Sequence, residues 1–189
     1  NDWSSSPLGW PETWPQALRS VASLMLGSRF PMFAAWGPDL AFVYNDAYAE
    51  ILGDKHPAAL GRRFREIWPE IWEAITPFVD SAMAGEATWA ENLPFTMNRH
   101  GYDEQTTFTF SYSPIRNEDG TVGGMFCSCT ETTARVRAGQ DARARPRRGA
   151  RAPRRDRHHH ADRPARPGAD RPDGLHVRAD RRGHRHAGR

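Results

Sequence analysis

The residues most able to do chemistry are two cysteines near the end of a strand-like segment. Cys127 and Cys129 are the only 2 cysteines of the chain, and one residue separates them. Zinc and redox sites usually need C-x-x-C spacing, which this pair lacks. On an extended strand, the observed spacing places both side chains on one face. We therefore interpret the two cysteines as small buried apolar residues and predict no metal site.

Sequence motifs of the common enzyme classes do not occur in the chain. It has no G-x-S-x-G, G-x-x-x-x-G-K-[ST] or H-E-x-x-H motif, no kinase ATP-binding region and no phosphoacceptor-histidine helix. We therefore predict no catalytic residue and no enzymatic activity for this chain. An enzyme with an unrecognised site is one alternative hypothesis.

Charge and aromatic residues divide the chain into two unlike parts. Residues 1–136 contain 9 Lys and Arg against 17 Asp and Glu, a net charge of −8, and all 20 aromatic residues. Residues 137–189 contain 17 Arg against 6 Asp, a net charge of +11, and Leu175 and Val177 are their only apolar side chains larger than alanine. Only the first part can bury a core, and its length suits a single domain.

The strongest secondary-structure signal lies in residues 101–133. Apolar and hydroxyl side chains alternate from Phe108 to Tyr112, which predicts a half-buried strand. Residues 114–120 end in Asp-Gly and predict a turn, and residues 121–129 predict the returning strand. A hairpin alone is barely stable in water, so the residues before it must supply further strands and a covering layer.

The preceding residues provide these elements. We predict a helix, two hairpin strands, three short helical segments and another strand, over residues 15–26, 30–36, 40–44, 45–52, 57–60, 68–83 and 88–97. Pro94 cannot donate a ladder hydrogen bond, so the strand that contains it is predicted at a sheet edge, with Trp89 and Glu91 on the face of Leu93. The predicted fold class is α+β: a five-stranded antiparallel sheet with short helices on one face and an N-terminal helix.

Two runs of sequence carry a family resemblance. FVYNDAYAEILGDKHPAALGRRFREIWPEIW and FTFSYSPIRNEDGTVGGMFCSCTETT resemble bacterial PAS sensory domains, of the kind found near the N-terminus of sensor and hybrid histidine kinases. Asn45 and Ala47 match the family's N-x-A pattern after the second strand, and Asp119-Gly120 matches its last hairpin turn. The resemblance implies a PAS domain over residues 30–136, preceded by a covering or dimer helix within residues 1–29.

The resemblance also indicates a signalling junction at the end of the domain. Glu131, Thr132 and Thr133 stand where many members have Asp-Ile-Thr, the junction that passes signals into a following helix. Glutamate in place of aspartate and threonine in place of isoleucine are departures from that pattern.

PAS domains form a cup between a curved sheet and short helices, which can enclose a small molecule. By that resemblance, the candidate cavity residues are Asn45, Tyr48, Trp36, Trp68, Phe108, Phe110 and Cys127. For Asn45, a helix cap is the competing interpretation, and for the tryptophans it is ordinary core packing.

The sequence argues against two familiar PAS cofactors. Flavin photoreceptor members carry a cysteine in a G-x-N-C-R-F run on the helices before the third strand, whereas both cysteines here are predicted on the last strand. Haem-binding members need an axial histidine in the helical region, and His56, the only histidine there, precedes a proline in a predicted loop. His100 is interpreted as a turn residue, and the identity of any ligand is left open.

From the resemblance we expect a PAS sensory input module of a two-component histidine kinase, acting in a phosphorelay. It would sense a small ligand or relay a conformational signal to a C-terminal output domain; the alternative is a ligand-free dimerisation or protein-interaction module. The expected partners are a second copy, through residues 15–26, and the kinase output domain.

No apolar run reaches the length of a membrane span and no signal peptide is present, so we expect a cytoplasmic protein. The start at Asn1 without Met is consistent with a fragment.

Residues 137–189 allow three interpretations. The 17 Arg resemble a polybasic arm for nucleic acid, and the run from His158 to His160 resembles a metal-binding tract. The absence of aromatic residues for base stacking argues against nucleic acid, and three adjacent histidines in a disordered chain are a poor preformed site. The Arg, Ala, Pro, Gly, Asp and His content is what G+C-rich codons give when read out of frame. We therefore predict a frameshift near Val136 that leaves a disordered tail.

Overall fold

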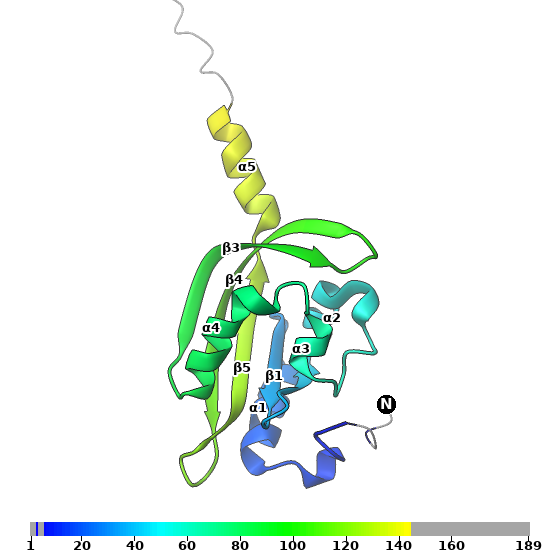
Figure 1. Cartoon of the computed structure of the whole chain (residues 1–189), viewed down its shortest axis with the longest axis vertical. Coiled ribbons are helices and arrows are strands. Elements are labelled where there is room, and N and C mark those ends of the chain that lie inside the picture. The colour runs from blue at the N-terminus through cyan, green and yellow to red at the C-terminus, as the bar shows by residue number, and fades with distance from the viewer. Residues whose placement is uncertain (1–2, 4–5, 145–189) are drawn as a thin grey trace, which may run out of the picture. The chain divides into compact units, whose positions relative to one another are not determined.

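The computed structural model describes residue 3 and residues 6–144, so the predictions made for residues 145–189 lie outside the described residues. At its centre is a five-stranded antiparallel sheet (Figure 1), with the order β2-β1-β5-β4-β3. The strands are β1 Met32–Trp36, β2 Ala41–Tyr44, β3 Thr88–Asn98, β4 Asp103–Arg116 and β5 Val122–Glu131. Together with the helices around it, this sheet confirms the predicted α+β fold.

The α-helices are α1 Gln16–Leu26, α2 Asp46–Leu52, α3 Phe64–Ile67, α4 Trp72–Met83 and α5 Thr133–Ala144, with single 3-10 turns at Pro11–Thr13 and Gly53–Lys55. Two helix predictions need correction. Residues 57–60 form turns, and the helix predicted over 68–83 begins only at Trp72. The delay has a local cause, because Pro69 disfavours helical backbone at Trp68 and cannot donate a helical hydrogen bond.

Helix α5 corrects the predicted start of disorder. Disorder was predicted from residue 137, but the helix runs from Thr133 to Ala144. Residues 137–144 contain Arg, Ala and Gln, which are favourable in helices. They carry no apolar side chain larger than alanine, so this stretch of α5 has no stripe with which to pack against another helix.

The helices cover the two faces of the sheet unequally (Figure 1). Helices α2, α3 and α4 pack on one side, here called the inner face, and α1 packs on the opposite, outer face. In the inner layer, the ring centroid of Phe33 lies 4.6 Å from that of Phe42, 4.9 Å from that of Phe64 and 5.1 Å from that of Tyr48. The outer layer joins α1 to the sheet through the buried residues Trp14, Leu18, Ala22, Met25, Ala34, Val43 and Ile115.

The edge strand β3 contains a β-bulge that changes which side chains point inward. Ala90 pairs with Phe110 and Leu93 pairs with Phe108, so two residues lie between consecutive inner-face positions. Asn92, inside the bulge, has a φ of 51°. Consequently Trp89 is 62% exposed and Glu91 is exposed as well, in contrast to the inward face predicted for them. The edge position predicted from Pro94 is confirmed.

Candidate functional site

A small cavity lies between the inner face of the sheet and helices α2 and α4. Its volume is about 30 Å³, enough for one or two water-sized groups. The lining residues from the helical side are Tyr48, Ile51, Ile71 and Ile75, and those from the strands are Phe33, Phe95, Met97, Phe108, Phe110, Tyr112, Cys127 and Cys129. Four of the sequence-predicted candidates, Tyr48, Phe108, Phe110 and Cys127, thus come together at this cavity.

The lining of the cavity is neutral. None of its described lining residues is Asp, Glu, Lys, Arg or His. Burial raises the pKa values of the Tyr48 and Tyr112 hydroxyls well above their ordinary value, and it does the same to the pKa of the Cys127 thiol. These groups therefore stay protonated near neutral pH and offer hydrogen bonds but no charge.

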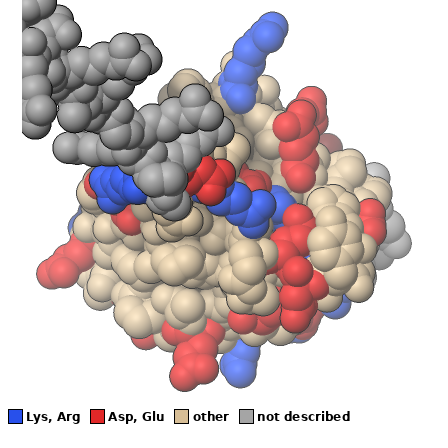
Figure 2. Space-filling view, turned by 90° about the horizontal axis from the view of Figure 1, so that it is seen from above, with Lys and Arg blue, Asp and Glu red and all other residues tan. Residues whose placement is uncertain are grey.

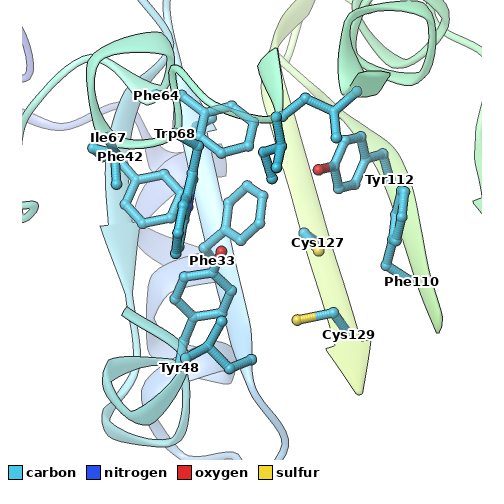
Figure 3. Close-up of a cluster of buried hydrophobic side chains, with 14 of the residues drawn as sticks. Phe33, Phe42, Tyr48, Phe64, Ile67, Trp68, Phe110, Tyr112, Cys127 and Cys129 are labelled. Carbon is cyan, nitrogen blue, oxygen red and sulfur yellow. The ribbon is translucent and has the colours of Figure 1, made fainter. Parts of the chain in front are cut away.

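Figure 3 shows how these groups are arranged. The Tyr112 hydroxyl and the sulfur of Cys129 point from the sheet toward the aromatic side chains opposite. Trp68 stands among those rings, 1% exposed, and its indole Nε1 has no hydrogen-bond partner within the described part of the chain. Trp68 belongs to the inner cluster without being a lining residue of the cavity.

Asn45, another sequence-predicted candidate, lies outside the cavity and is a buried hydrogen-bond hub. Its Oδ1 accepts hydrogen bonds from the backbone N of Tyr48 and of Met32, each at 3.1 Å. Its Nδ2 donates to three carbonyl oxygens, those of Met25, Ser28 and Phe30, at 3.1, 3.1 and 2.7 Å. These bonds use both ends of the amide to cap α2 and to hold the end of α1 beside β1.

Trp36 also lies away from the cavity, because it packs with the outer cluster at the end of β1. The neighbouring strand leaves room for its ring: a Cβ on Gly123 would lie 2.4 Å from the Trp36 side chain. At Gly124 a Cβ would lie 2.5 Å from the backbone oxygen of Ala35. The two glycines therefore allow a close approach of β5 to β1, which seats the Trp36 ring on β5.

The two histidines weighed as ligands both have partners at the periphery. His56 Nδ1 lies 2.8 Å from the Tyr44 hydroxyl, and His100 Nδ1 lies 2.8 Å from Glu104 Oε1. Neither histidine lines the cavity. With about 30 Å³ of space, the cavity does not fit a haem or a flavin unless aromatic side chains move out of it.

The predicted junction at Glu131, Thr132 and Thr133 is tied to the middle of β4. Thr132 donates from its backbone N to the Thr107 carbonyl at 2.7 Å. Thr107 in turn donates from its backbone N to the Thr133 hydroxyl at 2.9 Å, and that hydroxyl donates to Glu131 Oε1 at 2.8 Å. The first turn of α5 therefore continues directly from the strand ladder.

Arg99, in the β3–β4 turn, forms the ion pairs of this junction. Its Nη1 lies 2.8 Å from Glu131 Oε2, and its Nη2 lies 2.8 Å from Glu104 Oε2. The Arg99 side chain is 9% exposed, so one guanidinium joins two carboxylates with little solvent around it. Glu131, at the position where many members of the resembled family have aspartate, thus forms an ion pair with Arg99.

The Arg99 turn also contacts the helical layer. The backbone N of Asp54 donates to the Arg99 carbonyl at 2.9 Å. Gly53, with a φ of 55°, makes this approach possible, since a Cβ there would lie 2.7 Å from the same carbonyl oxygen. Glu70 Oε1 accepts from the backbone N of Asn98 at 3.0 Å and binds Lys55 at 2.7 Å. The β3–β4 turn therefore contacts the segments that follow α2 and precede α4, and through Arg99 it also contacts the junction.

Sequence reasoning missed Arg99, Tyr112 and Met97 as site residues. Tyr112 and Met97 follow the inward alternation of Phe108 and Phe95, so the strand period could have placed them at the cavity. Arg99 carries no such signal. Its role depends on the β3–β4 turn, which brings its side chain to Glu131 although the two residues are 32 positions apart in the sequence.

Metal-binding clusters and membrane-spanning helices are both absent from the described residues. Among the described residues, no three His, Cys, Asp or Glu side chains are close enough to hold a metal ion. No helix within those residues is long and apolar enough to cross a membrane.

Comparisons with known proteins agree with this architecture. A family model described as the PAS fold matches residues 28–137, more than half of the chain. An RNA-binding light-oxygen-voltage receptor is similar in structure, with a TM-score of 0.51 and 21% identity over 68% of this chain, which spans 37% of that receptor. A light-oxygen-voltage protein of Rhodobacter sphaeroides is also similar, with a TM-score of 0.50 and 14% identity. The similarity covers 66% of this chain and 75% of the Rhodobacter sphaeroides chain. No curated protein matches the sequence. At these identities, the structural likeness concerns the fold alone.

Proposed function

Because the chain belongs to the PAS family, we propose that residues 30–136 are the sensory input module of a cytoplasmic signal-transducing histidine kinase. In this proposal, a change in the inner core moves β5, and residues 131–133 pass the movement into α5 and a C-terminal output domain. The kinase output rests on the sequence resemblance. Relay through the junction rests on a structural observation. Arg99 pairs with Glu131 and Glu104 and accepts a hydrogen bond from Asp54, and we call this set of contacts the Arg99 clamp.

The Arg99 clamp supports relay because it makes the start of α5 sensitive to the sheet and to the helical layer together. Cys129 lines the cavity and lies two residues before Glu131 on the same strand. The Arg99 carbonyl receives its hydrogen bond from Asp54, directly after α2, and the Arg99 side chain binds Glu131. One residue, Thr130, separates Cys129 from Glu131, and one residue, Arg99, connects Asp54 with Glu131. A displacement of β5 or of the segment after α2 can therefore reach the Glu131 carboxylate directly.

Breaking the clamp tests this proposal. We expect Glu131→Gln to weaken the ion pair and to loosen the first turn of α5, so that amides near residue 136 exchange about tenfold faster, on the order of 1.4 kcal/mol of local opening. Hydrogen exchange followed by mass spectrometry on the full chain measures this change. In a fusion to a histidine kinase, the same substitution should change the basal kinase activity.

Glu66→Gln serves as the matched control, because Glu66 pairs with Arg62 at 3.1 Å on an exposed surface and takes part in none of the junction contacts. We expect it to leave both α5 exchange and kinase output unchanged. If Glu131→Gln also left both unchanged in a folded protein, relay through this junction would be wrong.

A second candidate function, dimerisation, is favoured by the exposed side of α1. Leu24 is 67% exposed and is part of the lining of a groove of about 410 Å³, whose other lining residues from α1, β4 and β5 include Val21, Pro114 and Phe126. An apolar side chain next to an apolar groove on one surface suits an isologous contact, in which each copy inserts its Leu24 beside the other's α1. We infer a homodimer through this surface.

Sedimentation velocity of wild type and Leu24→Arg tests the dimer. We expect the wild type to sediment as a dimer and the variant as a folded monomer, because a desolvated arginine would face an apolar groove. Glu73→Arg, at an exposed position of α4, makes a related charge change on the opposite side of the sheet and should remain dimeric. Equal sedimentation of all three proteins would exclude this interface.

A further inference from the structure

The core cavity limits the size of any molecule that binds in it. Its volume of about 30 Å³ is lined by rings and aliphatic side chains, including Phe33, Ile75, Phe95 and Phe110. A guest of about two or three non-hydrogen atoms fills such a space without moving the walls. Anything larger would push on lining side chains that are at most 8% exposed and closely packed.

The walls of the cavity also limit the charge of the guest. Its polar groups are the hydroxyls of Tyr48 and Tyr112, which approach from α2 and from β4, and the thiols of Cys127 and Cys129 on β5 (Figure 3). Burial raises the pKa values of Tyr48, Tyr112 and Cys127, which keeps these three groups neutral, and none of the described lining residues is Asp, Glu, Lys, Arg or His. An ion in the cavity would therefore lose its hydration without gaining an opposite charge.

We propose that this cavity is a binding site for a small neutral guest of the size of a diatomic gas, held by dispersion contacts with the walls and oriented by a weak hydrogen bond from a hydroxyl or thiol. The inference rests on the proposed sensory function, since it names the chemical class of the effector. The guest would touch Cys127 and Cys129, which lie on the strand that ends at Glu131. Occupancy would thus act on β5 itself.

Figure 2 shows a contrasting environment on one outer surface, where acidic and basic side chains lie close together. Charged ligands have partners on such a surface and none in the cavity. A neutral probe should therefore bind in the cavity, and a charged probe of similar size should not.

Xenon is a suitable probe, because it is neutral, apolar and similar in size to the proposed guest. We expect xenon pressure to shift the NMR signals of the Ile51 and Ile75 methyl groups in the full chain, with saturation at one site. Sodium formate is an anion of similar size and should cause no saturable shift at these methyl groups. The absence of a saturable xenon shift, or a saturable formate shift, would overturn the proposal.

Filling the cavity provides the matched variants. Cys129→Leu adds hydrocarbon inside the cavity and should abolish the xenon shift, whereas Thr130→Leu adds a similar group at an exposed position of the same strand and should leave the shift intact. Should Cys129→Leu not fold, Cys129→Val makes a smaller addition and is expected to reduce xenon affinity at least several-fold. Unchanged xenon binding in a folded Cys129→Leu protein would place xenon elsewhere and contradict the site.

The same sample separates this inference from the proposed function. If xenon binds and the exchange of α5 amides stays unchanged, the guest site is real and its relay to the junction is wrong. If xenon does not bind while Glu131→Gln alters α5, relay is supported and the guest class is wrong.

Discussion

The inner and outer faces of the sheet bury apolar residues in different ways. On the inner face, large rings from β1, β2 and β4 meet three helices, and the space left over is a cavity of about 30 Å³. On the outer face, small side chains such as Ala34 and Val43 meet the single helix α1, and a groove of about 410 Å³ remains open beside it. The inner layer therefore leaves far less free space than the outer layer.

This difference bears on where each of the two proposed functions would reside. A densely packed aromatic layer leaves little free space, so a change inside it must move the surrounding strands and helices. An incomplete layer can instead be completed by another apolar surface. The proposed sensing and relay therefore belong to the inner side and the proposed association to the outer side, and Asn45 is the residue whose hydrogen bonds join the two layers.

Removal of the Asn45 amide should have the largest effect, because it affects both layers. Asn45→Ala leaves two backbone N–H groups and three carbonyls without their side-chain partner, and we expect a loss of about 3 to 5 kcal/mol in the free energy of unfolding. Urea denaturation of the variant measures this loss. Asn117→Ala, in the exposed β4–β5 turn, should cost less than about 1 kcal/mol. Similar losses for the two variants would refute the role of Asn45 as a joint.

A pair of leucines allows the two layers to be compared directly. Leu18 on α1 and Leu52 on α2 are each 0% exposed. We expect Leu52→Ala to cost about 4 kcal/mol and Leu18→Ala about 3 kcal/mol, because α1 has open space beside it and can settle toward the sheet, whereas the inner layer cannot. Parallel urea denaturation curves provide the comparison. A larger loss for Leu18→Ala would show that the outer layer is as tightly constrained as the inner one.

Much of the fold follows from short-range patterns in the sequence. The alternation through Phe108, Phe110 and Tyr112 correctly predicted β4, and Pro94 correctly placed β3 at an edge. The inward positions of Trp89 and Glu91 were wrong because a bulge resets the alternation. Its only local signal is Asn92, since asparagine tolerates a positive φ better than most residues.

The candidate site was less predictable, for two physical reasons. Strand β1 is buried on both faces, so its sequence does not reveal that Phe33 faces the cavity while Trp36 packs on the outer side. The junction residues could be located from the resemblance, but their partner Arg99 depends on long-range pairing of strands. Local patterns predict strands well and ion pairs between distant turns poorly.

The smallest expected effect concerns Glu104, which shares Arg99 with the junction. The Arg99 hydrogen bond, with a further contribution from His100, lowers the pKa of the Glu104 carboxyl below its ordinary value of 4.5. As the pH falls, the unfolded chain therefore takes up this proton before the folded protein does. The stabilisation from Glu104 is complete above about pH 4.5 and is lost as the pH falls through the lower folded value.

We accordingly expect Glu104→Gln to reduce stability at pH 7 and to flatten the loss of stability below pH 4.5, so that the two proteins converge in acid. Urea denaturation across this pH range measures the difference, in which carboxylates common to both proteins cancel. High salt should shrink the difference at pH 7, since the Glu104 side chain is 16% exposed and part of the attraction is screened. Parallel pH profiles for the two proteins would show that Arg99 stabilises the fold through Glu131 alone. The Arg99–Glu131 ion pair would then be the one charged contact that connects the β3–β4 turn with the junction.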